Sequence, residues 1–153
     1  ARKVLLEIGG HRCDDHLPEL NETVGEALLR VHRSYLAPLR RLADARLLKG
    51  AAHITGGGLT DNVPRMLPDG LAASIRWGSW PVLPIFELLQ KLGKIPDDDW
   101  RRSFNLRIGM VFAVASSDLD RAMRLLSDSG ETPYQVGSVV PQDSPSEGRV
   151  LYR

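Results

Sequence analysis

Hydrophobic residues recur every three or four positions in several stretches of the chain, which is the spacing of one face of an α-helix. The predicted helices cover Arg2 to Ile8, Val24 to Arg30, Tyr35 to Leu48, Pro84 to Leu92, a segment that starts at Asp97, and a segment with Ala122, Met123, Leu125 and Leu126. In the third of these, Leu36, Leu39, Leu42 and Ala43 are predicted to face inward.

Shorter apolar runs between these helices predict strands. They lie at residues 51–54, 72–76, 108–115, 134–140 and 149–152, with a turn over 141–148 before the last one. The run at 108–115 is nearly all apolar, which is typical of a strand covered on both faces. The order strand, helix, strand over residues 108–140 suggests a right-handed crossover or a split arrangement.

Polar residues and glycines at the borders of the apolar stretches predict where several helices begin or end. Asp97, Asp98 and Asp99 are expected at a helix start, where negative charge complements the dipole, ahead of a magnesium site. Ser117 and Asp120 resemble a capping box, and Gly93 and Gly130 are expected to end helices.

The most informative stretch is His53 to Pro68, in which three successive glycines precede a helix-start signal and an arginine. Glycine brings backbone N–H groups close to a ligand, and a helix N-terminus adds unpaired donors. Residues 60–62 are candidate caps, Pro64 suits a first turn, and Arg65 carries a planar, permanently charged fork. The pattern therefore indicates an anion-binding loop, or a tight strand-to-helix turn whose glycines serve geometry alone.

A second loop, Trp77 to Phe86, has two tryptophans and two prolines around a serine. By residue type alone, it is a rigid connector whose aromatic rings fill a small core.

Together these segments resemble one enzyme family. His53 to Pro68, then 68–71, Trp77 to Phe86, Phe104 and Asn105 with 108–110, and finally 134–139 are similar to the C-terminal half of aminoimidazole ribonucleotide synthetases, also called phosphoribosylformylglycinamidine cyclo-ligases. The resemblance covers nearly the whole chain and is weakest at 1–22 and 141–153.

The resemblance implies an α+β fold, with a layered mixed sheet and helices packed on its faces. It implies that residues 1–153 form a single C-terminal domain of a two-domain enzyme whose N-terminal domain contributes dimerisation and most ATP and Mg²⁺ contacts. The implied reaction is ATP-dependent phosphorylation of the amide oxygen of formylglycinamidine ribonucleotide, followed by closure of the imidazole ring. The first residues are typical of the middle of a helix, so we expect a fragment.

We expect the cleft that faces the N-terminal domain to hold an anionic part of the substrate or nucleotide. Its candidate lining residues are Thr55, Gly56, Gly57, Gly58, Asn62 and Arg65. His53 is a candidate catalytic acid or base, although a histidine at the end of an apolar strand is as often a structural hydrogen-bond donor.

Several positions depart from the family pattern. Residues 31–37 stand where the family usually has Pro-Thr-Arg-Ile-Tyr-Val-Lys, so Arg33 and Tyr35 are retained while the threonine and lysine are lost. Arg107 stands at a usual glycine, and Asp61 at a common glutamate.

Composition limits the function classes. The chain has 153 residues and a formal charge of +1, which gives no global attraction to nucleic acid or to a membrane. Cys13 is the only cysteine, so an internal disulfide is excluded and a reducing compartment is favoured. No apolar run approaches a membrane span and residues 1–10 lack a signal-peptide layout, so we expect a cytoplasmic protein.

The stretch His11 to His16 matches no standard zinc spacing, and we expect no metal there.

Two other functions fit the same residues. One is a stand-alone module that binds a nucleotide or sugar phosphate, and the other is a different ATP-dependent phosphoryl-transfer enzyme of the same superfamily.

Overall fold

Short helices and short strands alternate along the chain, as the hydrophobic spacing predicts. The computed structural model describes residues 1–144 and 148–153. Its helical elements are η1 (Lys3–Ile8, a π-helix), α1 (Val24–Leu29), α2 (Leu36–Asp44), α3 (Gly58–Asn62), η2 (Val63–Met66, a 3₁₀-helix), α4 (Pro84–Gly93), α5 (Asp97–Ser103), η3 (Ser116–Asp118, a 3₁₀-helix) and α6 (Leu119–Ser127). Its strands are β1 (His16–Leu17), β2 (Glu22–Thr23), β3 (Leu48–His53), β4 (Leu71–Ile75), β5 (Met110–Val114), β6 (Gly137–Pro141) and β7 (Val150–Tyr152).

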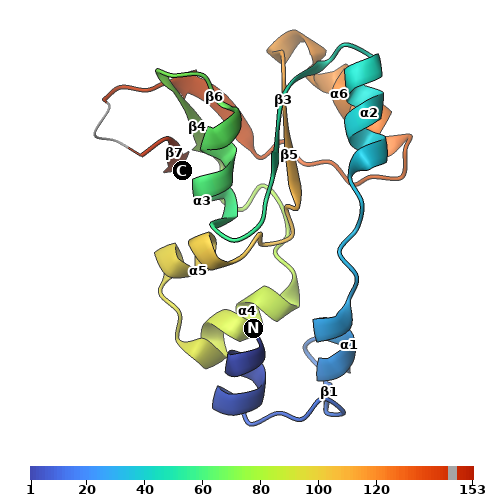
Figure 1. Ribbon diagram of the computed structural model, residues 1–153, viewed down its shortest axis with the longest axis vertical. Coiled ribbons are helices and arrows are strands. Elements are labelled where there is room, and N and C mark those ends of the chain that lie inside the picture. Colours follow the sequence, from blue (N-terminus) through green and yellow to red (C-terminus); the bar gives the residue numbers. More distant parts are fainter. Residues whose placement is uncertain (145–147) are drawn as a thin grey trace.

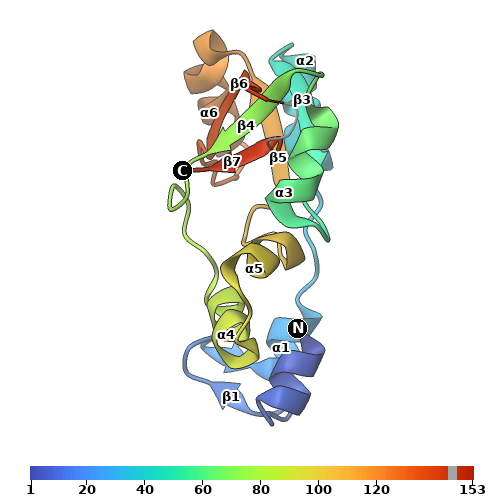
Figure 2. The ribbon, with the colours of Figure 1, turned by 90° about the vertical axis from the view of Figure 1, so that its left-hand side faces the viewer.

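The strands form small sheets that pair segments distant in sequence (Figure 1). Strand β3 is antiparallel to β5, with His53 opposite Met110. Strand β4 is central in a mixed sheet, antiparallel to β6 on one side and parallel to β7 on the other. Helices α2 and α6 lie at one end of the long axis, α1 and α4 lie at the other, and α5 lies between them (Figures 1 and 2). The predicted α+β class is confirmed.

Three hydrophobic clusters hold these elements together. The largest joins β3, β5, α3 and β4 through residues such as Ile54, Val111 and Ile75. A second packs η1 and α1 against α4, and a third packs α2 against α6. The first cluster positions the glycine loop, because that loop connects two of its members, β3 and α3.

The prediction that the two strands of the strand-helix-strand unit over residues 108–140 lie in one sheet is wrong. Strand β5 pairs with β3, whereas β6 pairs with β4, so the two strands lie in different sheets. The return strand also begins at Gly137 rather than at Tyr134, because the missing Cβ lets Gly137 lie against the carbonyl of Ser74. Strand β5 is not covered on both faces either, since Val111 is its one buried residue and the other four are partly exposed.

Helix α2 is shorter than predicted and exposes two residues that we expected to face inward. It ends at Asp44 because Arg46 takes a φ of 59° and β3 begins two residues later. Leu42 is fully buried, but Leu36 is 54% exposed and Ala43 is exposed. The buried contacts of the helix come from Pro38 and Leu42, four residues apart on one face.

The capping box predicted at Ser117 and Asp120 is wrong, since a 3₁₀ turn occupies its start and no side chain caps α6. A capping box forms instead at α1, where the Glu26 N–H donates to Thr23 Oγ1 at 3.2 Å and the Thr23 N–H donates to Glu26 Oε2 at 2.8 Å. The backbone hydrogen bond from Thr23 lowers the pKa of the Glu26 carboxyl.

The predicted start of α5 and the predicted end of α4 agree with the structure to within one residue. Helix α5 starts at Asp97, as the three aspartates predict. Helix α4 runs through Gly93, and Lys94 caps it with a φ of 47°. The turn predicted over 141–148 lies partly outside the described residues.

Arg107, where the family resemblance leads us to expect a glycine, takes the left-handed conformation that favours glycine. Its φ is 86°, and Leu106 before it has a φ of 49°. Leu106 is held there because it is 2% exposed and its carbonyl accepts a 2.9 Å hydrogen bond from Trp80 Nε1. The backbone of Arg107 is therefore strained.

We expect Arg107→Gly to raise the free energy of unfolding by about 1 kcal/mol, because relief of the strain exceeds the added entropy of the unfolded chain. Urea denaturation measures the change. Arg107→Ala removes the same charge but keeps the strain, so it should give no such gain; equal stabilisation by both variants would show that charge is responsible.

Candidate functional site

The glycine loop joins the end of β3 to the start of α3, and two of its glycines take positive φ. The angle is 97° at Gly57 and 57° at Gly58. The Gly58 N–H donates to the Thr55 carbonyl at 3.0 Å, and the Asp61 N–H donates to the Gly57 carbonyl at 3.0 Å. The helix thus begins inside the glycine run, with Gly57 as its N-cap, and the side-chain cap predicted at residues 60–62 is wrong.

The three glycines are needed for different reasons. A Cβ on Gly58 would overlap the carbonyl oxygen of Arg101, so the loop packs directly on the C-terminal end of α5. A Cβ on Gly57 would lie 2.7 Å from the Cβ of Asp61. A Cβ on Gly56 would meet nothing within 4 Å. Packing and backbone conformation therefore require Gly57 and Gly58, whereas neither requires Gly56.

The buried side chain of Asn62 holds the loop in place through hydrogen bonds to its carbonyl groups. It is 1% exposed, and its Nδ2 donates to the carbonyls of Gly58 at 2.8 Å and Gly56 at 3.1 Å. Its Oδ1 is buried without a hydrogen-bond partner among the described residues. The structure thus places Asn62 under the loop rather than on its surface.

The outer side of the loop offers free donors beside a carboxylate. The N–H groups of Gly56 and Gly57 make no hydrogen bond within the described part of the chain, and Thr55 and Gly56 are exposed. The carboxylate of Asp61 lies close to Gly57, since a Cβ there would be 3.0 Å from Oδ2. An anion is therefore favoured nearer Gly56 than Gly57.

Arg65 lies at the other end of the same helical segment. It belongs to η2, seven residues beyond Gly58, which corresponds to roughly 10 Å along the helix axis. Its side chain is exposed and makes no hydrogen bond or ion pair with the described residues. The structure therefore brings Thr55, the glycines and Asn62 together and leaves Arg65 apart from them.

His53, the last residue of β3, contacts a second histidine. Its Nε2 lies 3.1 Å from Nε2 of His32, and the ring centroids are 5.3 Å apart. Tyr35 packs against both rings, with centroid distances of 5.5 Å to His32 and 6.0 Å to His53. His53 is exposed, and its contact with His32 is compatible both with a structural hydrogen bond and with a proton-transfer role.

Tyr35 connects this histidine pair to an ion pair. Its hydroxyl lies directly over Gly109, where a Cβ would overlap it. The Arg33 guanidinium lies 5.8 Å from the Tyr35 ring centroid and donates to Glu131 Oε1 at 2.8 Å. Burial raises the pKa of the Tyr35 hydroxyl, so the phenol is protonated at neutral pH.

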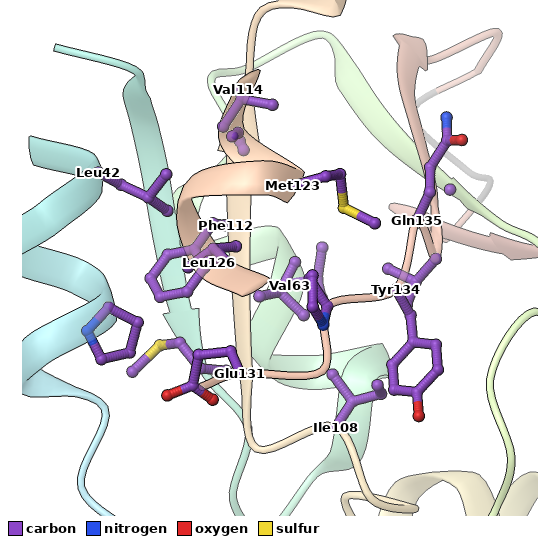
Figure 3. A pocket seen from close by; sticks show the side chains of 18 of the residues that line it. Leu42, Val63, Ile108, Phe112, Val114, Met123, Leu126, Glu131, Tyr134 and Gln135 are labelled. Carbon is purple, nitrogen blue, oxygen red and sulfur yellow. The ribbon is translucent and has the colours of Figure 1, made fainter. Parts of the chain in front are cut away.

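Beyond Tyr35 lies a largely apolar cavity of about 690 Å³ beside β5 (Figure 3). Phe112 and Val114 come from β5, Met123 and Leu126 come from α6, and the segment after α6 adds polar groups. Those polar groups are Glu131, Tyr134 and Gln135 (Figure 3). The cavity has the size and lining typical of small-molecule sites.

The sequence did not identify this cavity or the partner of Arg33. Glu131 is 98 positions from Arg33 in the chain, and no local pattern marks it. In the sequence, the family resemblance is the only feature that draws attention to Arg33 and Tyr35.

The tryptophan loop forms a core, as its residue types predict. Trp80 is 4% exposed, and the Trp77 ring packs edge-on against Trp80, Trp100 and Tyr152. The Arg101 guanidinium lies 4.9 Å from the Trp77 ring centroid. This aromatic cluster supports the carbonyl on which Gly58 packs.

Among the described residues, no group of three or more His, Cys, Asp or Glu side chains is arranged to hold a metal ion. In the stretch His11 to His16, Arg12 pairs with Asp14 at 3.1 Å and His11 lies 4.0 Å from Asp15. No helix among the described residues is long and apolar enough to cross a membrane.

Comparisons with known proteins match nearly the whole chain. The family profile described as AIR synthase related protein, C-terminal domain, matches residues 4–148. The chain is 46% identical over 143 residues to the phosphoribosylformylglycinamidine cyclo-ligase of Bifidobacterium animalis subsp. lactis, covering 93% of this chain and 42% of that protein. It is 43% identical over 151 residues to the enzyme of the same name from Shouchella clausii, covering 99% of this chain and 43% of that protein. The chain thus spans about two fifths of the length of these curated relatives.

The different surroundings of the glycines predict opposite effects of one substitution. Gly58→Ala should lower the free energy of unfolding by at least about 2 kcal/mol, because it adds backbone strain and a clash with the Arg101 carbonyl. Gly56→Ala, the matched control, should change it by less than about 0.5 kcal/mol. Urea denaturation of both variants measures the contrast, and equal losses would contradict the assignment.

Proposed function

Because the chain belongs to the family of AIR synthase related protein C-terminal domains, we propose that it is the C-terminal domain of a phosphoribosylformylglycinamidine cyclo-ligase. The observation that carries the proposal is identity above 40% to cyclo-ligases over more than nine tenths of the chain. The complete protein then includes an N-terminal domain, with which this chain forms the catalytic cleft, and it assembles as a homodimer in the cytoplasm.

The proposed reaction converts formylglycinamidine ribonucleotide to aminoimidazole ribonucleotide. When bound, ATP supplies a phosphoryl group that turns the amide oxygen into a leaving group. An internal nitrogen then attacks that carbon and closes the imidazole ring, with release of ADP and phosphate.

In this proposal the glycine loop binds an anionic part of the substrate or nucleotide. The fit rests on the unpaired N–H groups of Gly56 and Gly57 and on the open space where a Cβ of Gly56 would lie. Backbone donors that are already fixed in place stabilise phosphoryl charge without reorganisation. Asn62 acts here as a positioning residue, since it holds the carbonyls of Gly56 and Gly58.

Arg65 is assigned to an anionic group other than the one at Gly56. The two lie at opposite ends of the segment formed by α3 and η2, and an extended ribonucleotide can contact both. A permanently charged, exposed guanidinium suits a phosphate. We assign no Mg²⁺ ligand to this chain, because no group of three or more His, Cys, Asp or Glu side chains among its described residues is arranged to hold a metal ion.

His53 is the proposed acid or base at the edge of the cleft. It is exposed and ends β3 two residues before Thr55, so it is within reach of a ligand on the loop. Proton transfer by such a group typically contributes about 10²–10⁴-fold to a rate.

The proposal is tested by steady-state kinetics of the complete protein with formylglycinamidine ribonucleotide and ATP. Arg65→Ala should lower kcat/KM for one of the two substrates by about 10–100-fold, the effect of one lost charged hydrogen bond. Arg40→Ala, at an exposed arginine of α2, is the matched control and should leave kcat/KM unchanged.

Unchanged turnover and unchanged Michaelis constants in Arg65→Ala would refute the assignment of Arg65. Nucleotide binding without ATP-dependent ring closure in the parent protein would favour the stand-alone binding module or another phosphoryl-transfer activity.

A further inference from the structure

His53 at the end of β3 and His32 in the segment between α1 and α2 bring their imidazole rings together. Their Nε2 atoms lie 3.1 Å apart, and His32 and His53 are both exposed to solvent. At this distance one ring donates a hydrogen bond from Nε2 to the other. Neither Nδ1 atom makes a hydrogen bond within the described part of the chain, so the ring proton can move to Nδ1 and a metal ion can replace the shared proton between the two Nε2 atoms.

The pair is held by packing from both sides. His53 is fixed by the pairing of β3 with β5, opposite Met110. His32 lies in an irregular segment, but its ring packs edge-on against Tyr35, whose hydroxyl lies over the buried Gly109 of the strand region. The Arg33 guanidinium next to His32 is paired with Glu131, which offsets its repulsion of a cation.

Simple geometry tests whether one ion can contact both nitrogens. Zinc–imidazole bonds are about 2.0–2.1 Å long, so two nitrogens 3.1 Å apart subtend an angle of about 100° at the metal. This value lies between the octahedral and tetrahedral angles. We propose that His32 and His53 chelate one divalent transition-metal ion of the imidazole-preferring class, Zn²⁺, Ni²⁺ or Cu²⁺, at the entrance to the glycine loop.

The ligand chemistry selects this class of ion. Neutral imidazole binds zinc, copper and nickel well, whereas Mg²⁺ prefers oxygen ligands and keeps its waters. Because the described residues supply no third such ligand, water or a bound anion completes the coordination sphere. Binding should weaken as the pH falls, since the metal requires both rings to be neutral.

The proposed site depends on a feature of this chain. By the family resemblance, His32 stands at a position where a threonine is expected, and a threonine hydroxyl is not an imidazole ligand. The exchange His32→Thr therefore removes one ligand on an exposed segment. The proposal goes beyond the proposed cyclo-ligase activity and does not rest on it. A bound metal would occupy His53 Nε2, so the proton transfer proposed for His53 belongs to the metal-free protein.

The test is calorimetric titration of the complete, tag-free protein with Ni²⁺ or Zn²⁺ in the presence of excess Mg²⁺, which occupies oxygen-ligand sites. We expect one ion per chain and at least a ~10-fold loss of affinity in His32→Thr and in His53→Asn, since even outer-sphere partners of a metal contribute this much. His16→Asn, at an exposed histidine elsewhere, should bind as the parent does. The Cu²⁺ EPR spectrum of the parent should show coupling to two nitrogens.

Parent-like affinity in His32→Thr would overturn the proposal, as would absence of binding in the parent at millimolar metal. Both outcomes leave the proposed activity untouched, because no substrate is present. Thermal melting of the two ligand variants separates loss of a ligand from loss of the fold.

Discussion

The close packing of Gly58 on the C-terminal end of α5 is the constraint on which the glycine loop depends. The carbonyl oxygens of Arg101 and Phe104 occupy the space that a side chain at Gly58 would need. The first turn of α3 therefore meets the carbonyl end of α5, and that end is supported by the aromatic cluster around Trp77. The loop connects β3 to α3, and both elements belong to the largest hydrophobic cluster. The contact of Gly58 with α5 therefore fixes the loop between that cluster and α5.

The same packing limits where a ligand can bind. The inner side of the loop is occupied by Asn62, and Gly57 is bordered by Asp61. What remains accessible is the backbone at Gly56, with the exposed Thr55 before it. The three glycines are therefore not equivalent: Gly56 is accessible to a ligand, whereas Gly57 and Gly58 are required by the conformation and packing of the turn.

The sequence predicted most elements but not how the strands pair. Helical spacing located α1 and α4, the three aspartates located the start of α5, and the glycine run located the turn after β3. Strand pairing failed because β5 and β6 are joined by tertiary contacts to β3 and β4, which local patterns do not encode. For the same reason, the Arg33–Glu131 ion pair and the contact of His32 with His53 were invisible in the sequence. Asn62 was marked as important, but its burial under the loop required the structure.

The proposed role of the open backbone at Gly56 is to bind an anionic group of the substrate or nucleotide. This role can be tested with a crystal structure of the complete protein bound to formylglycinamidine ribonucleotide and a non-hydrolysable ATP analogue. We expect a phosphate oxygen within hydrogen-bond distance of the Gly56 N–H, on the side away from Asp61. Both ligands bound elsewhere, with the N–H groups of Gly56 and Gly57 facing only water, would contradict it.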